Sequence, residues 1–194
     1  MNPEPSRSHT DTRYRTIVAD PPWPYAGRPG RYPDPRLKTP GRAGPSLPMP
    51  YPTMTLGEIA ALPVGDLAEP DSHLYLWTTQ RFIYDAFRLV DTWGFRYSTL
   101  LVWSKKPKGI AGTFINSAEF VLFARRGTLP SLSKHLGSVF TWPRHEKADH
   151  SRKPEAFLDL VESVSPGPYL ELFARRQRLG WDTWGNEALE HVSL

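Results

Sequence analysis

Short apolar runs rich in β-branched residues alternate with segments of helical spacing along most of the chain. The runs predict strands over residues 14–19, 73–79, 99–104, 118–124 and 169–174, with one more over 181–184. Helices are expected to start at Thr55 and Pro154 and to span residues 81–93. The runs are apolar on both faces, which is typical of an open, doubly wound and mostly parallel α/β sheet with helices on both sides.

The expected helix ends carry local signals. Thr55 and Glu58 have the spacing of a capping box, so a short helix should begin there. Gly94 suits the left-handed residue that ends a helix, and Pro154 suits the first position of one.

Length and composition limit the class of protein. At 194 residues, 39% of them hydrophobic, the chain suits one domain, which we expect over residues 14–194 behind a disordered tail at 1–13. The absence of cysteine excludes disulfides, thiolate metal sites and cysteine nucleophiles, and it fits a reducing cytoplasm. No apolar run approaches 18 residues and the first residues lack an apolar core, so neither a membrane span nor a signal peptide is expected.

Polar residues follow the expected strands directly. In open α/β sheets, ligands bind at the carboxyl ends of the strands, so these residues should border the functional site. They are Asp20, Thr79, Lys105, Arg125 and Arg175. Basic runs at 105–106, 125–126 and 175–178 should gather on the same edge, and with the net charge of +4 they hint at a polyanionic partner.

The tetrapeptide Asp20-Pro21-Pro22-Trp23 directly follows the first expected strand. Proline has no backbone N–H, so the segment offers acceptors, namely the Asp20 carboxylate and a proline carbonyl, with few competing donors. An amino group with two hydrogens complements such a pair. Trp23 adds a flat face on which a base could stack. Two acceptors on an aromatic amine would also stabilise the positive charge that develops when the nitrogen is alkylated.

Seven blocks in matching order resemble the MT-A70 family of adenine N6-methyltransferases. They are VADPPW, PYPTMTLGEI at 50–59, LYLWTT at 74–79, LVWSKK at 101–106, HSRKPE at 150–155, YLELFARR at 169–176 and WDTWGNE at 181–187. The resemblance implies a Rossmann-like fold that binds S-adenosylmethionine. It also implies a permuted order, shared with β-class DNA amino-methyltransferases, in which the catalytic motif precedes the cofactor motif. Asp20, Pro21, Pro22 and Trp23 would be the catalytic residues.

The same resemblance assigns the cofactor site to residues of four blocks: Asp20, Lys153, Glu171, Leu172, Phe173, Arg175, Asn186 and Glu187. Lys153 would meet the cofactor's carboxylate at the positive end of a helix. Asn186 and Glu187 match a ribose-binding pair, and a carboxylate that accepts two ribose hydroxyls is usual on this fold. Leu172 and Phe173 could equally be core residues. YLELFARR lacks a G-x-G loop, so no glycine-rich turn is expected.

The long Pro- and Gly-rich stretch at residues 24–53 should be a basic active-site loop. Basic groups interleaved with aromatics suit a phosphate backbone and an exposed base. The candidate substrate-binding residues are Tyr25, Arg28, Lys38, Tyr51, Lys105 and Lys106. Residues 105–150 are the candidate substrate-recognition region. The spacing of His135, His145 and His150 fits no standard metal site, so no metal is expected.

Three functions remain in competition. The favoured one is methylation of adenine N6 in nucleic acid, with DNA preferred to RNA because small stand-alone members resemble prokaryotic or phage enzymes. Related proteins often act as dimers, so a homodimer is a candidate assembly. The second is a non-catalytic nucleic-acid-binding subunit that supports an active partner. The third is methylation of cytosine N4 or of protein glutamine, against which Asp20 argues, because such enzymes tend to carry Ser or Asn there.

Overall fold

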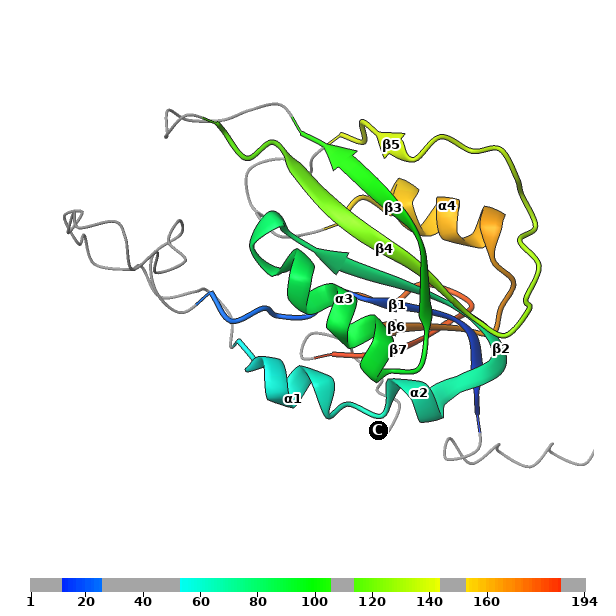
Figure 1. Ribbon diagram of the computed structural model, residues 1–194. Coiled ribbons are helices and arrows are strands. Elements are labelled where there is room, and N and C mark those ends of the chain that lie inside the picture. The colour runs from blue at the N-terminus through cyan, green and yellow to red at the C-terminus, as the bar shows by residue number, and fades with distance from the viewer. Residues whose placement is uncertain (1–11, 26–52, 106–113, 144–152, 186–194) are drawn as a thin grey trace, which may run out of the picture.

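The computed structural model describes residues 12–25, 53–105, 114–143 and 153–185. Seven strands form one sheet in the order β5-β3-β4-β2-β1-β6-β7 (Figure 1). The strands are β1 (Tyr14–Ala19), β2 (Ala68–Thr78), β3 (Arg96–Ser104), β4 (Ala118–Arg126), β5 (Val139–Phe140), β6 (Tyr169–Leu172) and β7 (Trp181–Trp184). The helices are α1 (Leu56–Ala60), α2 (Val64–Leu67), the 3-10 turn η2 (Gln80–Phe82), α3 (Ile83–Thr92) and α4 (Glu155–Val164).

The expected α/β fold with a mostly parallel sheet is confirmed. Strand β1 pairs in parallel with β2 and β6, β6 with β7, and β3 with β5. Only β4 runs the other way among the described strands, antiparallel to both β2 and β3. In chain order, β1 and β2 come first and β6 and β7 come last, yet β6 lies directly beside β1 in the sheet.

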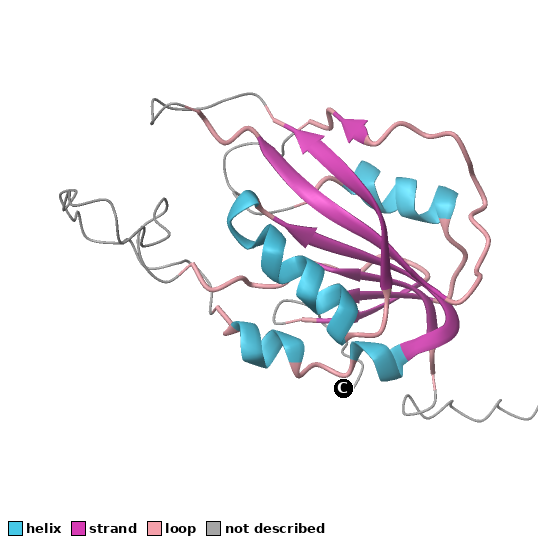
Figure 2. Ribbon diagram, in the orientation of Figure 1, coloured by secondary structure: helices cyan, strands magenta, loops and turns pink. Residues whose placement is uncertain are grey.

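Helices cover both faces of the sheet (Figure 2). Because side chains alternate along a strand, Ile17 belongs to the core cluster that contains α3, and its neighbour Val18 belongs to the cluster that contains α4. On β2, Leu76 packs in the first cluster and Trp77 in the second. The α4 face is rich in aromatic side chains, with the rings of Trp77 and Phe157 4.7 Å apart.

The structure confirms the local sequence signals that were expected at the helix ends. The capping box of Thr55 and Glu58 is present, and Thr55 Oγ1 accepts from the Glu58 backbone N–H at 3.2 Å. Gly94 has a φ of 77°, as expected for the residue that ends α3. Pro154 is the N-cap of α4 and lies one residue ahead of its first helical residue.

Several features depend on partners that lie far away in the sequence. Strands β2 and β3 start earlier than expected because of pairing with distant strands, since Ala68 of β2 lies opposite Tyr14 of β1 and Arg96 of β3 lies opposite Arg125 of β4. The single-turn helix α2 and the two-residue strand β5 were not anticipated, because elements this short have no periodicity to read. No helix in the described part of the chain is long and apolar enough to cross a membrane.

The reversed direction of β4 corrects one expectation about the functional edge. Arg125 and Arg126 follow a strand in sequence, but they pair with His73 and Ser72 at the start of β2. They therefore lie at the edge of the sheet opposite Asp20. The prediction that they border the Asp20 site was wrong, because it assumed that every strand ran parallel to β1.

Candidate active site

The strand β1 delivers Asp20 to the middle of the carboxyl edge of the sheet. Ala19 pairs with Leu76 on one side and with Leu172 on the other. The backbone N–H of Asp20 donates to the Leu172 carbonyl at 3.4 Å, so the carboxylate leaves the sheet where β1 and β6 end together. Leu172 itself is fully buried in the core, where it supports the backbone of Asp20.

The two prolines after Asp20 form a tight turn whose carbonyls are each partly used. Pro21 O accepts from the Trp23 N–H at 2.8 Å, and Pro22 O accepts from the Met54 N–H at 3.0 Å. A carbonyl oxygen has two lone pairs, so each can accept one further donor. The turn therefore keeps the acceptor-rich character that the sequence indicated.

Trp23 does not offer the stacking surface that was expected of it. Its side chain is 3% exposed, and the ring of Phe82 stacks on it at 5.2 Å with an interplanar angle of 10°. Its indole N–H donates to the Trp77 carbonyl at 3.2 Å. The prediction that a substrate base stacks on Trp23 was wrong in this arrangement, because the large apolar ring is buried in the core on the α3 side. Trp23 instead fixes the turn against β2 and η2.

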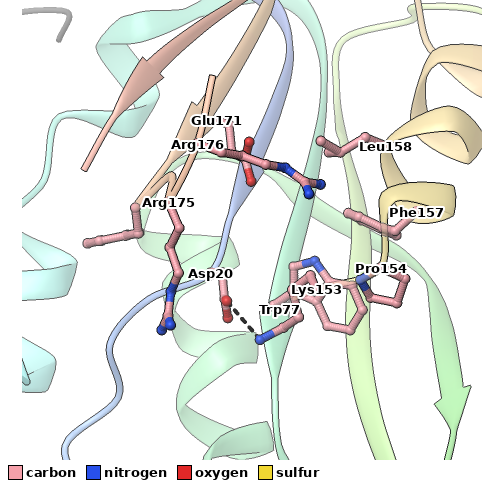
Figure 3. Close-up of a pocket in the computed structure, with 10 residues that line it drawn as sticks. Asp20, Trp77, Lys153, Pro154, Phe157, Leu158, Glu171, Arg175 and Arg176 are labelled. Carbon is pink, nitrogen blue, oxygen red and sulfur yellow. Dashed lines mark hydrogen bonds and ion pairs between the residues drawn. The ribbon is translucent and has the colours of Figure 1, made fainter. Parts of the chain in front are cut away.

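Lys153 lies just ahead of α4 and pairs with two acidic side chains. Figure 3 shows its ion pair with Asp20. Its Nζ is 2.7 Å from Asp20 Oδ2 and 3.4 Å from Glu119 Oε2. The same ammonium lies 5.1 Å from the centre of the Trp77 ring, which favours a cation. Lys105, at the end of β3, is paired with Glu119 and lies 4.1 Å from the ring centre of Trp103.

Glu171 is the least satisfied polar group of this site. Its Oε2 atom is buried and has no hydrogen-bond partner. Burial, together with the nearby charge of Asp20, raises the pKa of Glu171 from 4.5 to about 7, although Arg178 and Lys153 counteract this. We call Asp20, Lys105, Glu119, Lys153 and Glu171 the Asp20 cluster.

The pocket around Asp20 lies between the ends of β1 and β6 and the first turns of α4. Its free volume is about 30 Å³, which holds a water molecule but not a nucleoside. Its walls are Asp20, Trp77, Lys153, Pro154, Phe157, Leu158, Glu171, Phe173, Arg175 and Arg176. The Lys153–Asp20 ion pair lies at this pocket (Figure 3), so separation of the two side chains would enlarge it.

The turn after β6 contains no glycine, yet it has a left-handed residue and packs closely against the end of β7. Phe173 has a φ of 64°, a left-handed conformation that is costly for a bulky residue. The Ala174 N–H donates to the Trp184 carbonyl at 3.0 Å, which holds this turn against the end of β7. A Cβ atom on Gly185 would lie 2.5 Å from the Ala174 carbonyl oxygen. The glycine of the WDTWGNE block therefore permits this close approach.

The three arginines after β6 differ in position. Arg175 and Arg176 line the pocket, and Arg176 also forms an ion pair with Glu155 at the start of α4. Arg178 binds α4 instead, with its Nε 2.8 Å from Glu162 Oε1 and its Nη2 2.7 Å from Asp159 Oδ1. Arg178 therefore ties the β6–β7 connection to α4 and does not face the pocket.

The structure brings five of the eight expected cofactor residues to one pocket. Asp20, Lys153, Glu171, Phe173 and Arg175 line it, and Leu172 lies in the core beneath it. Of the expected substrate residues, Tyr25 shares a hydrogen bond of 3.0 Å with Thr79, and Lys105 is paired with Glu119. Arg28, Lys38, Tyr51, Lys106, Asn186 and Glu187 lie outside the described residues, as do most of the expected tail and basic loop.

Sequence reasoning missed Glu119, Trp77 and Phe157 as members of the site, and it placed Arg176 only in the basic run expected at this edge. Glu119 carried a usable signal, because it is a lone acidic residue inside the otherwise apolar block AEFVLFA. Trp77 and Phe157 carried none, since an aromatic residue in a strand or helix usually indicates core. Among the described residues, no group of three potential metal ligands occurs.

The mixed seven-stranded sheet with helices has the Rossmann-like α/β architecture that is typical of S-adenosylmethionine-dependent methyltransferases. Comparison with known families agrees, because the sequence matches the MT-A70 family over residues 14–187. The chain therefore belongs to the MT-A70 family, whose members are adenine N6-methyltransferases.

Individual relatives differ in length and in the substrate that their names state. The type II methyltransferase M.MunI of Mycoplasma sp is 32% identical over 183 residues, which cover 90% of this chain and 78% of the relative. The human N(6)-adenosine-methyltransferase catalytic subunit METTL3 is 24% identical over 90% of this chain but only 28% of its own length. Human N(6)-adenine-specific methyltransferase METTL4 is 29% identical over 70% of this chain and 33% of its own. The chain thus spans about a third or less of these two human relatives.

Proposed function

We propose that this protein transfers a methyl group from S-adenosylmethionine to the N6 amine of adenine in nucleic acid, with DNA preferred to RNA. The observation that carries the proposal is the position of Asp20. Its carboxylate stands at the carboxyl edge of the central strand, next to an acceptor-rich proline turn and a cation at the start of α4. The match to the MT-A70 family supports the reaction, and the similarity to a bacterial type II methyltransferase supports DNA.

The residues of the pocket fit the charges of the proposed cofactor. S-adenosylmethionine supplies a methyl group activated by a sulfonium, and it also carries a carboxylate and an ammonium. The Lys153 ammonium complements the carboxylate, and the unpartnered Oε2 of Glu171 complements a cation. Lys153 would exchange its Asp20 partner for the ligand's carboxylate, which would release Asp20 and enlarge the pocket.

Asp20 would then be free to accept a hydrogen bond from the adenine amine. The second amine hydrogen would go to the remaining lone pair of a proline carbonyl in the turn. Both acceptors favour the cationic amine over the neutral one, so they would lower the barrier at the moment of transfer. Holding the base in this position makes the transfer effectively intramolecular. The proton can leave after the methyl group has arrived.

The nucleic-acid side of the proposal rests on the basic segments. The loop at 24–53 with Arg28, Lys38 and Tyr51 would contact the backbone and the base, with Tyr25 at its base and Lys105 and Lys106 beside it. The target base would have to leave its stack to reach Asp20. The region at 105–150 as the recognition element, a homodimeric assembly and a prokaryotic or phage enzyme in the cytoplasm remain predictions.

A methylation assay with product identification tests this function. The purified protein and S-adenosylmethionine would be incubated with single- and double-stranded DNA and RNA of matched sequence, and digested nucleosides would be analysed by mass spectrometry. We expect N6-methyldeoxyadenosine, with more product from DNA than from RNA. Methylcytosine as the main product would overturn the base assignment. Oligonucleotide binding without any product would instead support the non-catalytic subunit.

A further inference from the structure

A second cavity lies on the α4 face of the sheet, beside the C-terminal half of α4. Its free volume is about 510 Å³, within the range of sites for small molecules. Its walls include Tyr75, Leu101 and Phe123 from the sheet and Leu160 and Val164 from α4. Most residues of the segment from Pro130 to Ser138 line a further side. It shares no lining residue with the pocket around Asp20.

Arg125 from β4 lines this cavity with an unsatisfied donor. Its Nη2 donates to Ser131 Oγ at 2.7 Å, and its guanidinium lies 5.1 Å from the centre of the Phe123 ring. Its Nε is buried and has no hydrogen-bond partner. No carboxylate in the described part of the chain forms an ion pair with it. A buried, unpaired guanidinium N–H is costly, so a site that retains one is suited to an acceptor from outside.

The other charged group on the cavity wall has the same sign. Lys134 lines the cavity, and none of the described residues that line it is an aspartate or glutamate. The cavity therefore combines two cationic side chains with aromatic and aliphatic walls, and this combination favours an anionic ligand over a cationic one.

An exposed aliphatic side chain lies on the wall of the cavity. Leu136 lines the cavity and is 52% exposed, so it offers an apolar contact to a ligand that enters from solvent.

We propose that this cavity binds a small amphipathic anion, with a flat apolar body between Phe123, Leu101 and α4 and a carboxylate, sulfonate or phosphate on Arg125. Such a ligand pairs with the Arg125 guanidinium and neutralises its charge, and a shift of this side chain into the cavity would bring the buried Nε within reach of the anionic group. The site is separate from the proposed methyl transfer and does not depend on it.

Fluorescence titration of the full-length protein with 8-anilinonaphthalene-1-sulfonate tests the site, because this probe has a flat apolar body and one anionic group. The neutral analogue N-phenyl-1-naphthylamine has the same body without the charge. We expect the anionic probe to bind at one saturable site, on the order of tenfold more tightly than the neutral probe. Equal affinities in the wild-type protein would overturn the proposal without any variant.

Three substitutions test whether the probe binds in this cavity. Arg125→Gln should weaken binding of the anionic probe by on the order of tenfold and leave the affinity for the neutral probe unchanged. Arg126→Gln is the matched control, because the neighbouring Arg126 donates to the Gly65 carbonyl outside the cavity. Val164→Phe should reduce binding of both probes by filling the space. Unchanged binding to Arg125→Gln, or displacement of the probe by S-adenosylmethionine, would overturn the proposal.

Discussion

Two polar groups of residues on the α4 face of the sheet differ in how completely their atoms are paired. One is the Asp20 cluster at the carboxyl edge. The other, which we call the Ser165 network, consists of His73, Tyr75, Ser165 and the Leu129 carbonyl near the amino edge. Ser165 Oγ lies 2.7 Å from His73 Nδ1 and 2.7 Å from the Tyr75 hydroxyl, and His73 Nε2 lies 3.1 Å from the Leu129 carbonyl.

The Ser165 network is neutral and complete. A carbonyl can only accept, so His73 Nε2 donates to Leu129, and Nδ1 then accepts from Ser165. Tyr75 donates in turn to Ser165. Burial is the main reason that the pKa of His73 falls from 6.5 to about 4, which keeps the ring neutral near pH 7. The network joins β2, the end of α4 and the segment after β4, so its function is to hold these elements together.

The Asp20 cluster is charged and incomplete. It holds three carboxylates and two ammonium groups, and one oxygen of Glu171 has no partner. A buried carboxyl oxygen without a hydrogen-bond partner lowers the stability of the fold. The comparison indicates that hydrogen-bond pairing distinguishes structural groups from binding groups. The polar atoms of a structural network pair with one another, whereas a binding site keeps some atoms unpaired for a ligand.

The largest expected effect follows from removing the Asp20 charge. Asp20→Asn keeps the shape of the side chain but weakens its hydrogen bond to a cationic amine. Methyl transfer should fall by on the order of 100-fold or more, measured as N6-methyladenine formed per unit time. Asp91→Asn, at an exposed position of α3, is the control and should be unaffected. An Asp20→Asn variant with normal activity would remove Asp20 from the reaction.

The second test breaks the complete network instead. Ser165→Ala removes the hydroxyl that bonds to both the Tyr75 hydroxyl and His73 Nδ1, so both buried groups lose this hydrogen-bond partner. The free energy of unfolding should fall by about 2–4 kcal/mol, measured by urea denaturation, because each buried orphan costs about 1–3 kcal/mol. Ser163→Ala, an exposed serine on the same helix, should change little. Methyl transfer measured well below the melting temperature should survive in Ser165→Ala, and its selective loss would mean that the two groups are coupled.

Features that depend on local sequence could be predicted, and features that depend on distant contacts could not. All six strands that were expected are present, because each is a short apolar run, and the capping box of Thr55 is a local signal. Asp20 and Lys153 were singled out by motif, and they lie 2.7 Å apart. The direction of β4, and with it the position of Arg125, depends on pairing between distant segments, which a local pattern does not encode.

Trp23 and Glu119 illustrate the two ways in which side-chain roles were missed. Trp23 has the chemistry to stack on a base, but whether its face is open depends on Phe82, nearly sixty residues away. Glu119 was passed over because its neighbours in sequence are apolar, yet β3 and α4 bring Lys105 and Lys153 to it. Both outcomes follow from tertiary contacts.

The two groups of residues should also respond to pH in opposite directions. The folded protein holds a proton on Glu171 up to about pH 7, whereas the unfolded chain releases it near 4.5, so this contribution to stability is lost as pH rises through that window. His73 titrates at about 4 when folded and near 6.5 when unfolded, so its contribution is lost as pH falls from 6.5 towards 4.

Glu171→Gln removes the titrating group and so isolates the contribution of Glu171 to the pH dependence of stability. Relative to this variant, the wild-type protein should lose at most about 3 kcal/mol of stability between pH 4.5 and pH 7, measured by urea denaturation at a series of pH values. Affinity for S-adenosylmethionine, measured by calorimetry, should rise over the same window in the wild type only, because ionised Glu171 attracts a cation. A parallel pH dependence in both proteins would show that Glu171 does not titrate there.

The smallest expected effect concerns competition for Lys153. Glu119 Oε2 lies 3.4 Å from Lys153 Nζ, and both side chains are partly exposed, so this ion pair is weak. Glu119→Gln should free the ammonium for the carboxylate of S-adenosylmethionine and lower the KM for this cofactor by about two- to threefold. Glu69→Gln, near the start of β2 and outside the pocket, is the matched control. A raised KM in Glu119→Gln would mean that Glu119 holds Lys153 in its binding position. Glu119 would then have a structural role like that of the Ser165 network, and it would not compete with the cofactor for Lys153.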